Sequence, residues 1–588
     1  MKLKIMVLGV LLTGIAMGDE TFPKEGWKEG PNPFASPDAV VGGEFVISAG
    51  PYTKSFNYYL DQTVTSAELF GAMYETLLSQ HPLTLEFDPG LAHRWTISDD
   101  KKTFTFWIDP EARWSDGKPV TPEDVKWTYE TVLDPKNLTG PHKIALERFQ
   151  PPEVVDEHSI RFTAKEVHWE NLMALAGLQI LPKHAYEKAD FNKINFEFPV
   201  VSGLYKLGEL KEGFYVLLER RGDWWAKDRP RAMGIGNFER LKYRFFMEDD
   251  NAFEAFKKGE IDYYPVYAAH RWATQTSGEK FDKNWIVKQA VYNYNPIGFQ
   301  GFAINLRRAP FDDVRIRQAL AFLLNREKMN RTLMYDAYFL QRSYFEDLYS
   351  KDNPCRNTMY AYDKEQARKL LAEAGWAANP KTGLLEKEGK PFVIRFLARS
   401  ATEDKFLAIY EEDLKDVGIK IEIVKKDWAA WSKDMDTYNF DMTWASWSAG
   451  IFKNPESMWL STEADRPSGQ NITGYKNPKV DELIAKQRTI FDVAERHEIV
   501  REIDQLISAD VPYILLWNLN YRRLLYWNKF GMPPTVLGKY GDERAAYWLW
   551  WHDEDAVADF EQAMETGSAL PRKPAKLVFD EVFKSGAK

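Results

Sequence analysis

The chain has 588 residues, of which 44% are hydrophobic, and its formal net charge is −10. This length predicts two or three domains with an ample core, and the acidic balance argues against a nucleic-acid partner, which would require a basic surface. The single cysteine, Cys355, excludes an internal disulfide and is expected to be an ordinary thiol.

The first eighteen residues are expected to be a signal peptide. Lys2 and Lys4 precede an apolar run over residues 5–15, and small residues stand at Ala16 and Gly18. A basic start, a short apolar core and small residues before the cleavage site are typical of secretory signals. The run is shorter than a membrane span, so a soluble mature form beginning near Asp19 is expected. A buried N-terminal helix is the alternative.

A strand and a helix are predicted early in the mature chain. Residues 44–48 have the alternation of a strand, and residues 67–78 have the pattern of a helix capped by Thr65 or Ser66. The loop over residues 62–65 lies between them.

Residues 91–125 combine a strand, a turn and a capped helix. Apolar and polar side chains alternate over residues 103–108, and Asp-Gly within 114–118 supplies tight-turn chemistry. Thr121 is expected to cap a helix that begins with Pro122 and has Asp124 three residues beyond the cap. The buried face of that helix is predicted to carry Val125, Tyr129 and Val132.

Further elements follow along the chain. Residues 205–220 predict two strands with a Glu-Gly turn, and residues 251–262 predict a helix that ends at Gly259. Residues 301–325 and 367–376 each predict a helix, the second with a glycine stop. Residues 414–424 end a helix at Gly418 and enter a strand, and residues 511–517 predict one buried strand. One helical face within 301–325 is expected to carry Ile316, Ala319, Leu320, Leu323 and Leu324.

Aromatic residues are abundant, with 21 Trp, 28 Tyr and 36 Phe. Most must pack in the core, as expected for Trp224, Trp225 and residues 548–551. One group is expected to reach a ligand in part: Trp428, Trp431, Trp444, Trp447 and Trp459.

Residues 91–125, 251–262, 301–325 and 441–450 together resemble the family 5 extracellular solute-binding proteins, which capture peptides for ABC importers. The resemblance runs from about residue 41 to residue 526. Residues 342–345 and 456–474 look like the oligopeptide-binding branch from Gram-negative periplasms. The tail after Asp553 lies outside the match and is expected to be a surface extension.

The resemblance implies an α/β fold: a two-lobed periplasmic binding protein, type II in its large three-domain variant, with a hinge and an interlobe ligand cleft. The implied division assigns 19–60, 196–295 and 512–588 to lobe 1, 61–195 to an inserted domain and 296–511 to lobe 2. The implied function is capture of oligopeptides by hinge closure and delivery to a permease and its ATPase in the inner membrane. A periplasmic monomer without a cofactor or metal is expected.

The resemblance also implies where a peptide would bind. The expected ligand-binding residues are Gln62, Thr63, Val64, Thr65, Arg399, Asp404, Trp444, Ser446, Trp447, Ser448 and Asn471. Relatives place an aspartate shortly after the tryptophan at Trp447, where it pairs with the ligand's amino terminus, whereas this chain has Ser448, Ala449 and Gly450. Asp404 is therefore a candidate for the amine, Arg399 is a candidate for a ligand carboxylate, and solvated loop charges are the plain alternative for both.

Two other functions stay open at this point. One is the same transport role for an oligosaccharide, an opine or a metal chelate. The other is a secreted hydrolase, for which Asp116, Glu123, Asp124 and Asp441 are the available carboxylates. Each of those carboxylates has a plainer place at a turn or helix end, and no G-x-S-x-G, H-E-x-x-H or C-x-x-C motif occurs.

Overall fold

A computed structural model describes residues 19–53, 55–61, 63–193, 198, 200–399 and 401–583. The expected signal peptide (1–18) and Gln62 lie outside these residues, as does the side chain of Trp428. The described chain forms two compact units, one with residues up to Asn32 and Pro51–Met233, the other with Pro33–Gly50 and Gly234 onward. This division differs from the predicted lobes, whose boundaries stay a prediction. No helix in the described part has the length and apolarity needed to cross a membrane.

The first unit is built on an antiparallel sheet with the strand order β1-β5-β6-β8-β7. Its strands are β1 (Glu20–Phe22), β5 (Ala92–Ile97), β6 (Thr103–Ile108), β7 (Glu153–Val154) and β8 (Ser159–Thr163). The unit also contains the strand pairs β3 (Leu78–Gln80) with β4 (Phe87–Pro89) and β9 (Tyr205–Lys211) with β10 (Tyr215–Arg220). Its helices are α1 (Val64–Met73), α2 (Pro122–Leu133), α3 (Gly140–Leu146), α4 (Asn171–Ala176) and α5 (Lys183–Tyr186).

Local sequence signals account for the strand β6 and the helix α2. Thr121 and Asp124 form the predicted capping box, in which each side chain accepts a hydrogen bond from the other residue's backbone N–H. Gly117 takes a positive φ of 84° in the predicted turn. The predicted buried face of α2 is confirmed, since Val125, Tyr129 and Val132 are all buried.

A half-buried carboxylate, that of Glu75, follows the end of α1. The Glu75 Oε2 atom accepts hydrogen bonds from the indole N–H groups of Trp225 (2.7 Å) and Trp224 (3.4 Å), and its backbone N–H donates to Ser202 Oγ. Burial raises the pKa of Glu75 to about 7, although the indole hydrogen bonds and Arg231 oppose the shift. The folded state therefore keeps a proton at pH values where the exposed glutamate of the unfolded chain has already lost it.

We expect Glu75→Gln to stabilise the protein at alkaline pH. Because the folded pKa is raised, the favourable contribution of the protonated carboxyl is complete below the unfolded pKa and is lost as pH rises through the folded value. The loss is on the order of 1–3 kcal/mol, and the amide, which keeps an acceptor for Trp225, avoids it. Urea unfolding at about pH 5 and about pH 8 measures the difference, with Glu166→Gln as an exposed control. An equal pH dependence in Glu75→Gln and wild type would contradict the prediction.

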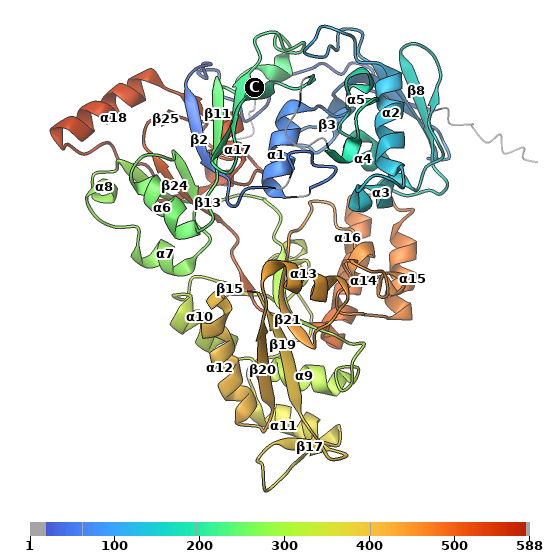
Figure 1. The fold of residues 1–588 in the computed structure, drawn as a ribbon, viewed down its shortest axis with the longest axis vertical. Helices are drawn as coiled ribbons and strands as arrows, with labels where there is room; N and C mark the ends of the chain where they lie inside the picture. The colour runs from blue at the N-terminus through green and yellow to red at the C-terminus, as the bar shows by residue number, and fades with distance from the viewer. Residues whose placement is uncertain are drawn as a thin grey trace, which may run out of the picture. The chain divides into compact units, whose positions relative to one another are not determined.

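The second unit is built around two large sheets (Figure 1). The first, which we call the upper sheet, includes six strands of this unit in the order β27-β13-β24-β12-β2-β11. Their bounds are β2 (Glu44–Ser48), β11 (Arg240–Arg244), β12 (Tyr263–Pro265), β13 (Ile286–Tyr292), β24 (Arg522–Trp527) and β27 (Lys576–Val578). The segments that accompany it are α6 (Asp249–Lys257), α7 (Ala269–Thr274), α8 (Glu279–Asp282), β25 (Phe530–Gly531), α17 (Ala545–Leu549), β26 (Trp551–His552), α18 (Glu554–Thr566) and α19 (Phe579–Val582).

The other sheet, the lower sheet, has the order β20-β19-β21-β14-β22. Its strands are β14 (Phe299–Ile304), β19 (Val393–Ala398), β20 (Lys420–Lys425), β21 (Met442–Trp447) and β22 (Tyr513–Leu515). The helices around it are α9 (Val314–Phe322), α10 (Arg326–Leu333), α11 (Lys364–Glu373), α12 (Asp404–Lys415), α13 (Trp428–Asp436), α14 (Glu456–Trp459), α15 (Pro478–Gln487) and α16 (Val493–Asp510). The short strands are β15 (Phe339–Leu340), β16 (Ala377–Ala378), β17 (Leu385–Lys387), β18 (Lys390–Pro391) and β23 (Trp517–Asn518).

The lower sheet and its helices enclose a continuous apolar core. The predicted apolar face is confirmed, because all five of its residues are buried in this core. Three of them lie on α9, and Leu323 and Leu324 directly follow it. Figure 1 shows α12 beside β20, and the predicted glycine stops after α11 and α12 are present at Gly375 and Gly418, both with positive φ.

Three predicted elements differ from the structure. The helix expected over 67–78 is α1, which begins at Val64 with Thr63 as its N-cap and ends at Met73. The strand expected over 511–517 is two short strands, because β22 pairs with β14 and β23 pairs with β15. The tail after Asp553 is not a surface extension, since β27 pairs with β13 and buries Leu577. The second and third differences arise because the strands pair with partners that are distant in sequence.

Candidate functional site

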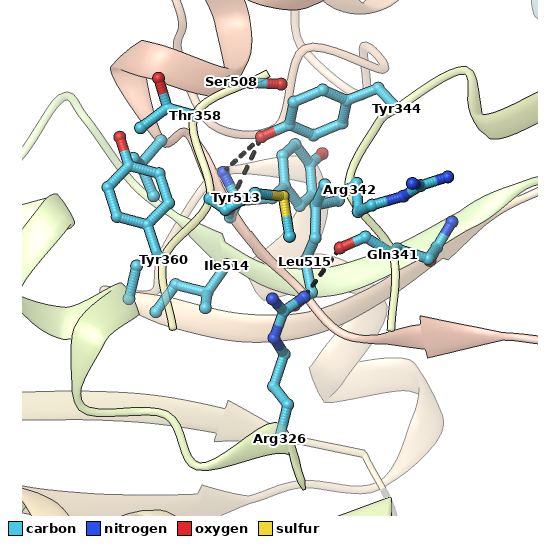
Figure 2. Close-up of a pocket in the computed structure, with 13 residues that line it drawn as sticks. Arg326, Gln341, Arg342, Tyr344, Thr358, Tyr360, Ser508, Tyr513, Ile514 and Leu515 are labelled. Carbon is cyan, nitrogen blue, oxygen red and sulfur yellow. Dashed lines mark hydrogen bonds between the residues drawn. The ribbon is translucent and has the colours of Figure 1, made fainter. Parts of the chain in front are cut away.

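A small cavity lies within the lower part of the second unit (Figure 2). Its volume is about 30 Å³, and Figure 2 shows Arg326 reaching toward the backbone while the Tyr344 hydroxyl meets the Tyr513 backbone. Arg326 donates hydrogen bonds to the carbonyl groups of Gln341 (2.8 Å) and Leu515 (2.9 Å). This space suits about one water molecule and is too small for an organic solute.

A larger hollow, which we call the intersheet pocket, takes its walls from both sheets of the second unit. Its volume is about 370 Å³, within the range typical of small-molecule sites. The lining residues are Pro265, Val266, Tyr267, Phe299, Gln300, Tyr338, Ser446, Trp447, Asn518, Leu519, Tyr521, Arg522, Arg523, Leu524 and Glu543. Because its walls come from both large sheets of the unit, the intersheet pocket is the candidate binding site.

Two segments pass between the upper and lower sheets beside this pocket, residues 293–298 and residues 519–521. The Gly298 carbonyl accepts a hydrogen bond from Asn518 Nδ2 (2.7 Å), which ties the first segment to the residue just before the second, and another from Gln341 Nε2 (2.9 Å). A Cβ atom at Gly298 would lie 2.0 Å from the Trp447 carbonyl oxygen. Only glycine allows this approach of β14 to β21 at the pocket wall.

The hydrogen bonds of β14 reveal which main-chain groups face each neighbour. The Leu516 N–H donates to the Gln300 carbonyl (2.9 Å), and the Ile304 N–H donates to the Pro512 carbonyl (3.0 Å). The even-numbered residues of β14 therefore direct their main-chain groups toward β22. Because successive residues of a strand alternate in this respect, the odd-numbered residues face β21.

Among the described residues, this alternation leaves a main-chain edge of β21 without a strand partner, which we call the free main-chain edge. Phe299 is paired with Trp447, so the main-chain groups of Trp447 face β14. Those of Ser446, one residue earlier, face the opposite edge, where β19 pairs with β21 only as far as Thr443. Within the described residues, no strand partners Ser446 at that edge. An extended ligand could pair there by main-chain hydrogen bonds.

Trp447 and Trp444 have different positions. The Trp447 indole N–H donates to the Tyr513 hydroxyl (3.2 Å), and the half-buried ring lines the pocket. The Trp444 indole N–H donates to Gln300 Oε1 (3.1 Å), and its ring packs edge-on against Trp517 in the core. Of these two predicted ligand contacts, only Trp447 lines the pocket.

The predicted charged ligand contacts, Arg399 and Asp404, lie beside the lower sheet but away from the pocket. Asp404, the first residue of α12, accepts a hydrogen bond and forms an ion pair with Lys425 at 2.6 Å. The Arg399 guanidinium lies 5.8 Å from the Trp431 ring centroid. Neither Arg399 nor Asp404 lines the intersheet pocket, so their contact with a ligand stays a prediction.

The Asn471 side chain is hydrogen-bonded to main-chain groups of its own segment. Its buried amide nitrogen donates to the Tyr475 carbonyl (2.9 Å) and the Leu460 carbonyl (3.3 Å), and its amide oxygen accepts from the Tyr475 N–H (3.0 Å). These bonds hold the turn that precedes α15. Trp459, expected to reach a ligand in part, is instead only 1% exposed in an aromatic core cluster. Ser448 is exposed directly after β21.

The residues predicted at 62–65 belong to the first unit. Thr63 Oγ1 accepts a hydrogen bond from the Ser66 N–H (3.2 Å), so Thr63 is the helix cap that was expected at Thr65 or Ser66. Val64 is 64% exposed in the first turn, whereas Thr65 is buried. Their contact with a ligand stays a prediction, as does that of Gln62.

The sequence interpretation missed the polar residues that β24 and the following chain bring to the pocket. Arg522 and Arg523 open a strand whose remaining residues are apolar, and Glu543 precedes α17. Two adjacent arginines at the start of a buried strand were a usable signal, because such charges are rarely buried without a partner. No group of three or more His, Cys, Asp or Glu side chains that could hold a metal occurs in the described part of the chain.

A family model described as "Bacterial extracellular solute-binding proteins, family 5 Middle" matches residues 86–468. The chain is 29% identical to the "probable peptide-binding protein YejA" of Agrobacterium fabrum over 552 residues, which cover 86% of this chain and 89% of the relative.

Solved structures have the same fold. The oligopeptide-binding protein AppA of Bacillus subtilis, in complex with a nonapeptide, matches with a TM-score of 0.73 and 22% identity, covering 88% of this chain and 100% of AppA. NikZ of Campylobacter jejuni, in complex with Ni(L-His), matches with a TM-score of 0.69 and 20% identity, covering 88% of this chain and all of NikZ. These similarities confirm the predicted α/β fold of periplasmic binding proteins.

Proposed function

Because the chain belongs to family 5 of the bacterial extracellular solute-binding proteins, we propose that it captures a peptide or peptide-like solute for an ABC importer. The periplasmic solute-binding role is common to the family, whereas the choice of solute is our proposal. The relationship to YejA, which carries the name of a peptide-binding protein, supports that choice.

The observation that carries the proposal is the free main-chain edge at Ser446 beside the intersheet pocket. Main-chain hydrogen bonds to this edge would hold an extended backbone whatever its side chains. Trp447 borders the same pocket and offers a large rigid face to a side chain of the solute. A strand edge next to an aromatic wall suits a peptide better than a sugar or a bare ion.

The proposed mechanism is closure about the two segments at 293–298 and 519–521. Contacts of the solute with both sheets would favour the closed state, and the permease would recognise that state. No bond is made or broken. A soluble periplasmic form beginning near Asp19, acting as a monomer with its permease and ATPase, belongs to the same proposal.

Purification from a periplasmic extract, followed by native mass spectrometry, tests the solute class. We expect copurified peptides that fragment into amino-acid series. Adding such a peptide to the stripped protein should reduce the radius of gyration in small-angle scattering and raise the melting temperature, because a ligand of the folded state stabilises it by mass action. An unchanged radius with a bound peptide would contradict closure.

The alternative is the same transport role for an opine, an oligosaccharide or a metal chelate. NikZ, with the same fold, was solved with Ni(L-His), so the fold is compatible with such a solute. The mass of a copurified non-peptide solute, or metal detected by elemental analysis, would replace the peptide proposal while leaving the transport role intact.

A further inference from the structure

The charged residues that line the intersheet pocket are unequal in number. Arg522 and Arg523 supply two guanidinium groups, whereas Glu543 is the one carboxylate among the described lining residues. The described lining therefore carries a net positive charge.

Arg523 is a buried cation without an anionic partner in the described chain. Its side chain is only 3% exposed, and its two Nη atoms donate to the hydroxyl groups of Tyr338 (3.0 Å) and Tyr521 (3.2 Å). Its buried Nε has no hydrogen-bond partner. The rings of Trp272 (5.6 Å), Tyr338 (4.9 Å) and Tyr521 (5.5 Å) also form cation–π contacts with the guanidinium, which stabilise the charge without neutralising it. No carboxylate in the described chain balances this buried cation, and its burial carries a desolvation cost.

Lys288 on the neighbouring strand β13 is a third cation, and it adds to the positive potential near Arg523. Lys288 Nζ donates to the Trp272 carbonyl (2.7 Å), and burial together with the positive charge of Arg523 lowers the pKa of Lys288. Arg522 donates to the neutral Asn295 Oδ1. In the described part of the chain, neither arginine nor Lys288 forms an ion pair with a carboxylate.

Glu543 offsets only part of this charge. Its carboxylate accepts a hydrogen bond from the Tyr267 hydroxyl. One carboxylate oxygen is thus engaged by the protein. The pocket is left with a surplus of positive charge that an anionic solute group would neutralise.

We propose that the intersheet pocket anchors the solute by an anionic group, a carboxylate, which binds Arg522 while the buried guanidinium of Arg523 strengthens the local positive potential. A guanidinium suits this task because its donors match the two oxygens of a carboxylate. The proposal rests on the proposed peptide-binding function and adds which end of the peptide is recognised. It also accounts for binding without the amine-pairing aspartate that Ser448, Ala449 and Gly450 replace.

The test uses a pool of random tri- to pentapeptides in three forms: free termini, amidated C-terminus and acetylated N-terminus. Peptides retained by the full-length mature protein are quantified by mass spectrometry. We expect amidation to reduce retention at least about tenfold, which corresponds to about 1.4 kcal/mol, and acetylation to leave it within about threefold. Arg522→Met should abolish the preference for free C-termini, and Arg522→Lys should keep part of it. Equal retention of amidated and free peptides would overturn the proposal.

A second measurement separates this proposal from the peptide function. Succinate and its uncharged diamide, succinamide, are compared as thermal-shift probes. Succinate should raise the melting temperature of the wild type but not of Arg522→Met, and succinamide should affect neither. If no peptide form is retained but succinate acts through Arg522, the peptide function fails and the anion site stands. If succinate has no effect through Arg522 and free peptides show no preference, the anion site is refuted.

Discussion

Replacing Trp447 with alanine is expected to weaken binding of a copurified peptide by at least about 30-fold, equivalent to about 2 kcal/mol, because truncation removes a large aromatic wall of the pocket. The change also leaves the Tyr513 hydroxyl without its indole donor, so a modest fall in melting temperature is expected. Isothermal titration calorimetry measures the affinity, and Trp447→Phe separates ring contact from the hydrogen bond.

Trp431→Ala is the matched control for this prediction. Trp431 lies on α13 in the same part of the unit and does not line the intersheet pocket, but it lies next to Arg399. If Trp431→Ala weakens binding as strongly as Trp447→Ala, the solute binds near Arg399 instead, and the sequence-based prediction of that residue would be favoured over the intersheet pocket.

Gly298→Ala is expected to lower both stability and affinity. The new Cβ would lie 2.0 Å from the Trp447 carbonyl oxygen and 3.1 Å from Ser448 Cα, and these are backbone atoms that cannot rotate away. Strands β14 and β21 must separate, at a cost of about 3 kcal/mol or more, and the pocket wall moves with them. Thermal unfolding and calorimetry measure the two effects.

Gly450→Ala provides the comparison for Gly298→Ala. A Cβ atom at Gly450 would meet its nearest neighbour, the Phe452 carbonyl oxygen, at 3.4 Å, which is close to an ordinary contact. This variant should unfold near the wild-type temperature. A wild-type melting temperature for Gly298→Ala would show that β14 and β21 adjust at little cost, and the tight approach would then not define the pocket.

Prediction from sequence succeeded where neighbours along the chain decide the structure. The capping box of Thr121 and Asp124, the buried face of α2 and the glycine stops after α11 and α12 depend on residues within about one turn of each other. It failed at residues 511–517, where a uniformly apolar run gives no sign of the break between β22 and β23.

Only some of the predicted ligand-binding residues meet at the intersheet pocket, for a related reason. Ser446 and Trp447 end a strand that the family resemblance already aligned, and both line the pocket. Asp404 was a reasonable candidate carboxylate, but Lys425 from the adjacent strand β20 forms an ion pair with it. The location of an ion-pair partner follows from strand order, which residue types alone do not specify.

The sequence by itself determined the family, the α/β fold and most helices and strands, since these depend on short-range periodicity, caps and a resemblance spread along the chain. Only the tertiary structure decided which side chains share the pocket. Its walls combine Tyr267, Phe299, Tyr338, Trp447 and Arg522, contributed by segments that lie far apart along the chain. Long-range strand pairing brings them together. Only the tertiary structure shows that the buried guanidinium of Arg523 has phenols rather than carboxylates as its hydrogen-bond partners.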